Sequence, residues 1–166
     1  MADRLPVSVA LRPVVSEDEP FLYHVYATTR QEELAQVDWD EATRDAFLAS
    51  QYAAQRHHYL THYNNASFQV ILRGGQPAGR LYVARWEHEI RIMDVAVLPE
   101  HRNAGIGSAL IRALQEEAGR DKKSVTIHVE MFNRAARLYE RLGFRNKTLN
   151  GVYWLMEWTP PSEATG

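Results

Sequence analysis

Residues 95–108 read Val95-Ala96-Val97-Leu98-Pro99-Glu100-His101-Arg102-Asn103-Ala104-Gly105-Ile106-Gly107-Ser108. An apolar run typical of a strand leads into a short loop with two glycines, and apolar residues at helical spacing follow. The first turn of a helix has free backbone N–H groups and a partial positive charge, which attract phosphate. Because Gly105 and Gly107 have no Cβ, an anion can approach the backbone there.

The glycine pair alone has two interpretations. It lacks the Gly-Lys-Ser/Thr ending of a Walker A loop. It also lacks the third glycine of a dinucleotide-binding fingerprint and that motif's acidic residue about twenty positions on. A plain strand-to-helix turn that uses the conformational freedom of glycine explains the same residues. The loop by itself leaves phosphate binding and a simple turn equally open.

A second segment, over residues 124–144, adds a β-branched strand and a short helix that ends at Gly143. Arg102-x-x-Gly105-x-Gly107 resembles the acyl-CoA pyrophosphate loop of the GNAT N-acetyltransferase superfamily. The superfamily's second signature is similar to the pattern formed here by Asn133, Ala136, Leu138 and Tyr139 before Leu142-Gly143-Phe144. The two motifs stand in the superfamily's order, and the resemblance is detailed from about residue 81 to residue 144.

Composition favours one domain over residues 1–166, with a loose tail from about residue 160. The chain has 166 residues and a formal net charge of −2, which argues against binding to nucleic acid or to an anionic membrane. It has neither an apolar run long enough for a bilayer nor a signal-peptide core. Cysteine is absent, which excludes disulfides and a cysteine nucleophile and fits a cytoplasmic location.

Periodicity predicts an α/β fold of the α+β type, with a mixed sheet. We expect helices over about 20–34 and 40–63, the first preceded by capping-box spacing from Ser16 to Glu19, and strands over 7–12, 68–72, 77–86, 89–98, 124–130 and 152–158. Hairpins make most of the sheet antiparallel, whereas the crossover through the helix after Gly105 makes one central pair parallel. The resemblance implies that this pair splays apart near Val97 and Val129, with helices on both faces.

The resemblance also implies acetyl-CoA as co-substrate, with no metal. Its contacts fall on Val97, Leu98, Arg102, Asn103, Ala104, Gly105, Ile106, Gly107, Ser108, Asn133 and Tyr139. The amides of 102–108 would face the pyrophosphate, and the Val97 N–H would polarise the thioester carbonyl. Arg102 is otherwise a solvated loop arginine, and Asn133 is otherwise the N-cap of the short helix.

Three residues are candidates for the chemistry. Tyr139 matches the superfamily's general-acid tyrosine, although it also fits the apolar stripe of the short helix. Asp94 stands in an otherwise apolar strand, where an acid is costly unless paired or used. Glu130 ends the neighbouring strand. Either carboxylate could take the amine's proton or anchor its charge. The alternatives are a salt bridge from Asp94 to Arg91 or Arg80, and a merely exposed charge at Glu130.

We therefore expect an N-acetyltransferase that moves an acetyl group from acetyl-CoA to a primary amine by direct attack in a ternary complex. Alternatives are transfer of another acyl group, transfer to a protein amine, or a CoA-binding regulatory module without turnover. His58 and His62 have metal-clamp spacing but lack the Glu of a zinc-protease motif, so a polar helix face is favoured. A homodimer through the last strand is possible, and the acceptor is not specified.

Overall fold

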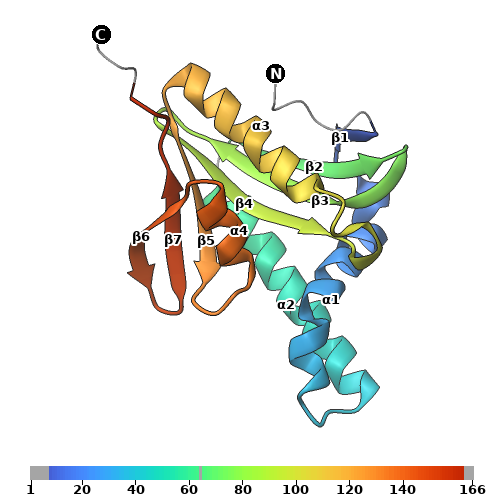
Figure 1. Ribbon diagram of the computed structural model, residues 1–166. Helices are drawn as coiled ribbons and strands as arrows, with labels where there is room; N and C mark the ends of the chain where they lie inside the picture. The colour runs from blue at the N-terminus through green and yellow to red at the C-terminus, as the bar shows by residue number, and fades with distance from the viewer. Residues whose placement is uncertain (1–7, 64, 163–166) are drawn as a thin grey trace.

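The computed structural model describes residues 8–63 and 65–162 (Figure 1). The expected elements are present with small shifts of their ends. The first expected strand begins at Val7, which lies outside the described residues. The helices are α1 (Glu19–Ala35), α2 (Glu41–His62), α3 (Ile106–Asp121) and α4 (Ala135–Arg141). The strands are β1 (Val9–Pro13), β2 (Ala66–Arg73), β3 (Gln76–Arg85), β4 (Glu89–Val97), β5 (Ser124–Glu130), β6 (Arg145–Asn150) and β7 (Tyr153–Trp158).

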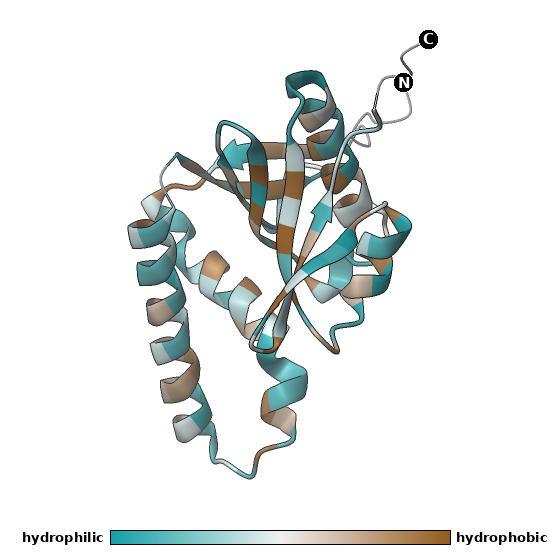
Figure 2. Ribbon diagram, turned by 90° about the vertical axis from the view of Figure 1, so that its left-hand side faces the viewer, coloured by the Kyte–Doolittle hydropathy of each residue, from teal (hydrophilic) through white to brown (hydrophobic). Residues whose placement is uncertain are grey.

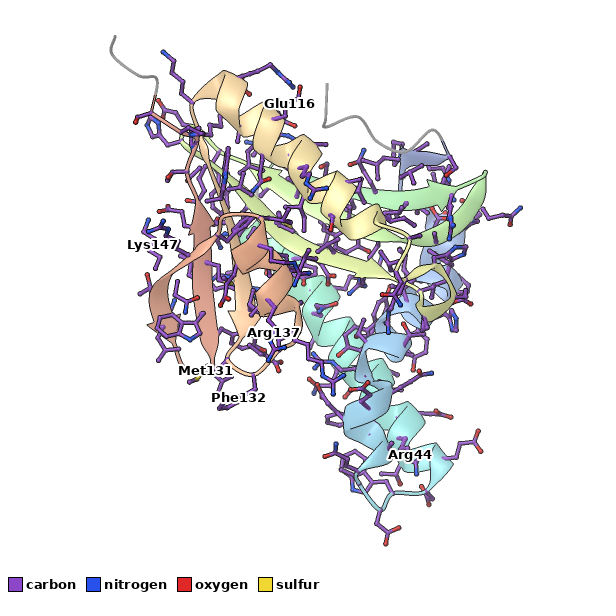
Figure 3. All side chains as sticks on the ribbon, viewed as in Figure 1. Arg44, Glu116, Met131, Phe132, Arg137 and Lys147 are labelled. Carbon is purple, nitrogen blue, oxygen red and sulfur yellow. The ribbon has the colours of Figure 1, made fainter. Side chains whose placement is uncertain are left out.

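Among the described residues, seven strands form one mixed sheet in the order β1-β2-β3-β4-β5-β7-β6. Within it β4 and β5 are parallel and the other neighbours are antiparallel, which confirms the expected mixed sheet. Figure 1 shows α3 in front of the sheet and α2 behind it. Helices therefore lie on both faces of the sheet. In Figure 2 the loop that joins α1 to α2 lies far from the sheet.

The core between α3 and the sheet explains why this helix forms where it does. Its buried residues recur at helical spacing and pack against the apolar side chains of the central strands. They are Ile106, Leu110, Ile111, Leu114 and Ala118. On the opposite face α1 makes a smaller cluster, in which Val25 packs with Ala96 and Leu98. Successive residues of β4 thus serve opposite faces, as the pleat of a strand requires.

Two local features differ from the expectation. Strand β6, between Phe144 and the last strand, was not predicted, because its residues Arg145–Asn150 are all exposed and lack apolar alternation. The capping box from Ser16 does not form. Instead Asp18 accepts the N–H of Val15 (2.8 Å) and both guanidinium nitrogens of Arg12 (2.8 Å each) at the start of α1.

The parallel pair opens along its length. Pairing between β4 and β5 runs from Glu89 with Ser124 to Ile92 with Ile127 and then stops, although the strands continue to Val97 and Glu130. The separation begins at a register shift in the β3–β4 ladder, opposite Tyr82 and Val83. A β-bulge of this kind bends a strand away from its partner. The sheet is therefore open where the resemblance implies a splayed pair.

In the part of the chain that the structure describes, no helix is both long enough and apolar enough to cross a bilayer.

Candidate active site

A cleft of about 750 Å³ opens where β4 and β5 separate. One wall comes from α1 and α2, and the floor comes from residues 93–96 of β4 and 127–130 of β5. Tyr139 and Asn133 reach it from the α3 face of the sheet, and Tyr153 reaches it from β7. The cleft is thus lined from both faces. It brings together all three predicted catalytic residues, Asp94, Glu130 and Tyr139.

The glycine loop presents a run of free donors beside this opening. Among the described residues, none of the amides of 103–108 donates a hydrogen bond, whereas the next one, Ala109 N–H, binds the Gly105 carbonyl (3.0 Å). Gly105 has φ of 76°, a left-handed conformation that favours glycine. At Gly107 no described atom lies within 4 Å of an added Cβ, so packing does not require a glycine there.

Arg102 is tied to the loop rather than free. Its N–H donates to the Pro99 carbonyl (3.2 Å), so its amide is not among the free donors. Its Nε donates to the Val97 carbonyl (3.0 Å), which connects the end of β4 with the loop. Arg102 therefore differs from a purely solvated loop arginine, and its terminal nitrogens remain to contact an anion.

The backbone of Val97 faces the opening. The next residue, Leu98, donates its N–H to the Ala78 carbonyl across the ladder with β3 (2.8 Å). Adjacent residues in a strand direct their N–H and C=O groups to opposite edges, so those of Val97 point toward β5. The Arg102 contact with the Val97 carbonyl agrees with this direction. The side chain of Leu98 is buried against α1 and packs rather than facing the cleft.

Tyr139 combines a buried ring with an unpartnered hydroxyl. The ring packs edge-on against Phe144 in the main core, at 5.8 Å between centroids, as its place in the apolar stripe predicts. Its hydroxyl makes no hydrogen bond to any described residue, and the residue lines the cleft. Burial, with a smaller contribution from the charge of Asp94, raises the pKa of Tyr139 to about 12. The phenol therefore keeps its proton at neutral pH.

Asp94 is held in a network of buried and half-buried groups. Its Oδ2 accepts hydrogen bonds from Arg80 (2.6 Å) and from the Tyr59 hydroxyl (3.2 Å). Arg80 also donates to Gln55 Oε1 (3.1 Å). The side chain of Arg80 is only 2% exposed, and that of Asp94 is 15% exposed. Of the two possible ion-pair partners, Asp94 takes Arg80, whereas Arg91 pairs with Glu89 on the same strand (2.9 Å).

Glu130 has a different environment. It receives one long hydrogen bond, from the Tyr153 hydroxyl (3.5 Å). No basic side chain in the described ranges forms an ion pair with it, although two other carboxylates of the cleft are paired, Glu33 with Arg30 and Asp94 with Arg80. Glu130 is thus the carboxylate of the cleft whose charge is not neutralised by an arginine.

Asn133 caps the short helix and also lines the cleft. Its Oδ1 accepts the N–H of Ala135 (2.8 Å) at the start of α4, although the helix proper is preceded by Arg134. This bond occupies the oxygen and leaves the amide nitrogen to donate. The helix-start position that the sequence suggested is therefore correct to within one residue, and it is compatible with a contact to a ligand.

The sequence did not identify Gln55 or the role of Tyr59. A signal was present for Arg80, a charge inside the otherwise apolar run of β3. For the α2 residues the helical pattern shows only a polar surface, and a contact to a strand about thirty-five residues away is invisible in it. His58 and His62 stack at 4.5 Å on that surface, and the described residues contain no cluster suited to a metal.

Comparison with known proteins agrees with this architecture. A PaiA N-acetyltransferase from Thermoplasma acidophilum, in complex with coenzyme A, has a TM-score of 0.69 at 15% identity, over 92% of this chain and 99% of that one. The ribosomal-protein-S18-alanine N-acetyltransferase of Escherichia coli has a TM-score of 0.61 at 19% identity, over 95% and 97%. A GNAT family acetyltransferase from Elizabethkingia anophelis with acetyl-CoA bound has a TM-score of 0.60 at 16% identity, over 93% and 99%.

At these identities the likeness shows a common fold. No curated protein sequence matches the chain significantly. The profile of the Acetyltransferase (GNAT) family, however, matches residues 25–144, which include α2, the glycine loop, the open strand pair and Tyr139. The chain therefore belongs to the GNAT acetyltransferase family.

Proposed function

We propose that this protein transfers an acetyl group from acetyl-CoA to a primary amine within a ternary complex. The observation that carries the proposal is the run of free amides at 103–108 beside an opening in the sheet, which leads to a cleft lined by Tyr139, Asp94 and Glu130. Structures of the same fold with coenzyme A or acetyl-CoA bound support the choice of donor.

The free amides and the positive end of α3 suit the pyrophosphate of coenzyme A, with Arg102 as a further contact. Gly107 supports this assignment, because packing does not require a glycine there and alanine is the better helix former. The thioester would extend between the open strands, where the Val97 N–H points. Asn133 lines the cleft, and its Nδ2 would donate a hydrogen bond to an amide of the pantetheine arm of coenzyme A.

The transfer balances with the groups in the cleft. The amine nitrogen forms a bond to the acetyl carbon while the carbon–sulfur bond breaks. An alkylammonium first loses one proton to Glu130 or Asp94, directly or through water. Tyr139 gives its proton to the departing thiolate, and the second proton that leaves the nitrogen as the amide forms returns to Tyr139 through water. The Val97 N–H stabilises the negative charge that develops on the carbonyl oxygen. Since most of an alkyl amine is protonated at neutral pH, removal of its proton is required before attack.

Two alanine substitutions in α3 test the donor site. Gly107→Ala adds a methyl group where we place the pyrophosphate, so we expect the affinity for coenzyme A to fall about tenfold or more by calorimetry. Gly119→Ala adds the same methyl group to the same helix in open space and should leave the affinity unchanged. Equal affinities of Gly107→Ala and the wild type would contradict the site.

A panel of amines tests the reaction itself, through release of thiol from acetyl-CoA. Turnover with small primary amines supports the proposal as stated. Turnover with a peptide N-terminus alone would redirect it to a protein amine, and faster release from a longer acyl-CoA would redirect it to another acyl group. Tight binding of coenzyme A without acetylation of any amine in the panel would identify a regulatory module instead.

A further inference from the structure

Helix α2 forms the wall of the cleft where we place the amine acceptor, and few buried contacts hold this wall. Helix α2 has 22 residues and none of them is buried, in a segment that the structure describes throughout. Its half-buried positions form one narrow stripe along the helix, namely Arg44, Leu48, Tyr52, Gln55 and Tyr59. A helix with so little burial is not held by its apolar surface, so other contacts decide where it lies.

Besides the ion pair of Arg56 with Glu19 and the aromatic contacts of Tyr52, α2 has hydrogen bonds that converge on Asp94. The Tyr59 hydroxyl donates to Asp94 Oδ2 (3.2 Å) and is also within hydrogen-bond distance of the Met93 carbonyl (3.3 Å). Arg80, held by Asp94 at 2.6 Å, donates to Gln55 one turn earlier on α2. Two successive turns of α2 are therefore joined to the sheet through one carboxylate. We call Gln55, Tyr59, Arg80 and Asp94 the α2 latch.

A second cavity lies on the other side of the latch. It has a volume of about 190 Å³ and is bounded by the start of α1, by β2 and β3, and by α2. Three residues of the latch, Gln55, Tyr59 and Arg80, line both this cavity and the cleft. These three side chains therefore separate the cavity from the cleft. Because there is space on both sides of them, close packing does not fix their position, and they can shift when their hydrogen bonds are removed.

We propose that Asp94 is a positioning residue, which fixes α2 through the latch and thereby sets the width of the acceptor site. The assignment deepens the proposed function and rests on it. Arg80 neutralises the charge of Asp94, so the pair as a unit attracts an incoming ammonium group weakly. Glu130, which faces the same cleft and has no basic partner among the described residues, then receives the amine or its proton.

Tyr59→Phe tests the latch without altering any charge. We expect kcat/KM for ethylamine to fall about tenfold, the usual effect of losing a hydrogen bond to a charged group. The change should appear in KM for the amine and leave KM for acetyl-CoA unaltered. The preference for 2-phenylethylamine over ethylamine should rise, because the wall can retreat. Tyr23→Phe is the matched control, since Tyr23 packs on Tyr52 of α2 but lies outside both cavities.

Asp94→Asn separates positioning from proton transfer. If Asp94 positions α2, the variant loses at least as much as Tyr59→Phe, since it also takes the ion-pair partner from the buried Arg80, and the loss appears in KM for the amine. The double variant should lose little more than Asp94→Asn. Glu130→Gln should instead lower kcat, because the proposed proton acceptor is gone. A fall of kcat in Asp94→Asn with an unchanged KM for the amine would overturn the proposal and identify Asp94 as the base.

Hydrogen exchange keeps this test independent of turnover. Residues 41–62 should exchange faster in Tyr59→Phe and in Asp94→Asn than in the wild type or Tyr23→Phe, whereas the amides of α3 should not change. Unchanged exchange of α2 in both variants would refute the latch. A wild-type protein that acetylates no amine would refute the proposed function, while the exchange result would still decide whether the latch exists.

Discussion

Helices α3 and α2 lie on opposite sides of one sheet, and they are fixed there by different forces. α3 has 16 residues, of which five are buried in the main core. Each of its large apolar side chains contributes about 2 kcal/mol through burial. α2 is longer but buries none of its 22 residues, and it is joined to the sheet by a few polar groups and by aromatic edges such as Tyr59 on Tyr82.

The difference corresponds to the two ligands that we propose. The α3 side would bind the pyrophosphate, a group that is the same in every catalytic cycle, and a rigid apolar core suits a fixed site. The α2 side would bind the acceptor. A wall held by the latch can be altered by one or two polar substitutions without loss of the core. The comparison therefore predicts large costs on the α3 side and small, specificity-changing costs on the α2 side.

The largest effect is expected where the two sides meet, at Tyr139. Tyr139→Phe removes the proposed proton donor, so kcat should fall about a hundredfold or more. Since the hydroxyl has no partner among the described residues, neither the midpoint of urea unfolding nor the affinity for coenzyme A should change. Steady-state kinetics and urea unfolding measure both. A variant that keeps the wild-type kcat would rule out Tyr139 as the acid.

The dependence of kcat on pH gives a second test of Tyr139. With its pKa raised to about 12, Tyr139 remains protonated across the range in which the amine loses its proton. We therefore expect kcat to rise with pH and not to decline through deprotonation of this residue below about pH 11. A decline between pH 8 and 9 in the wild type that is absent from Tyr139→Phe would contradict the assignment.

The contrast between the helices is tested directly by paired leucine truncations. Leu110→Ala in α3 removes a side chain that is 1% exposed and should lower the free energy of unfolding by about 3 kcal/mol. Leu60→Ala in α2 removes one that is 61% exposed and should change it by less than about 0.5 kcal/mol. Urea unfolding measures both values. Similar losses in the two variants would contradict the distinction drawn between the helices.

Gly79→Ala tests strand β4, whose residues pack against α3 on one face and against α1 on the other. A Cβ on Gly79 would fall on the carbonyl oxygen of Ala96, in the ladder between β3 and β4. Because that atom belongs to the backbone, it cannot move aside cheaply. Gly79→Ala should therefore lower the free energy of unfolding by about 2 kcal/mol. Gly119→Ala is the control and should raise it by up to about 1 kcal/mol. A neutral Gly79→Ala would show that β4 tolerates displacement.

The sequence predicts the α3 side far better than the α2 side. Strong periodicity marks α3, and Gly105 occupies the left-handed turn that its place before a helix suggests. The antiparallel neighbours β2, β3 and β4 and the parallel β4–β5 pair follow from hairpins and one crossover. Strand β6 escapes prediction because it is exposed on both faces and is stabilised by pairing with β7, which no local pattern reveals.

The candidate site divides in the same way. Tyr139, Asn133 and the glycine loop lie within motifs that are local in sequence, so their positions could be predicted. Asp94 could be recognised as unusual in an apolar strand, but its bond to Tyr59 joins residues far apart in the chain. Contacts of this kind depend on the angle at which α2 crosses the sheet. That angle is a tertiary property, and helical spacing does not encode it.

The smallest predicted effect concerns the ion pair at the start of α1, which anchors the acceptor side. Bonds from Arg12, together with the N–H of Val15, hold the pKa of Asp18 at about 2, below its ordinary value of 3.8. An acid whose pKa is lowered by folding stabilises the protein above the unfolded value, and this contribution disappears as the pH falls from about 4 to 2. Because Arg12 is partly exposed, we expect about 1 kcal/mol.

Asp18→Asn should therefore lower the free energy of unfolding by about 1 kcal/mol at pH 7, and the difference from the wild type should vanish near pH 2. Asp40→Asn is the comparison variant. Asp40 is exposed and caps α2 by accepting the N–H of Thr43. Its hydrogen bonds with Thr43 lower its pKa, and asparagine preserves this cap, so we expect a smaller loss than at Asp18. Urea unfolding at pH 7, 4 and 2.5 measures the difference. A cost at Asp18 that is independent of pH would mean that the charge of Asp18 does not secure α1.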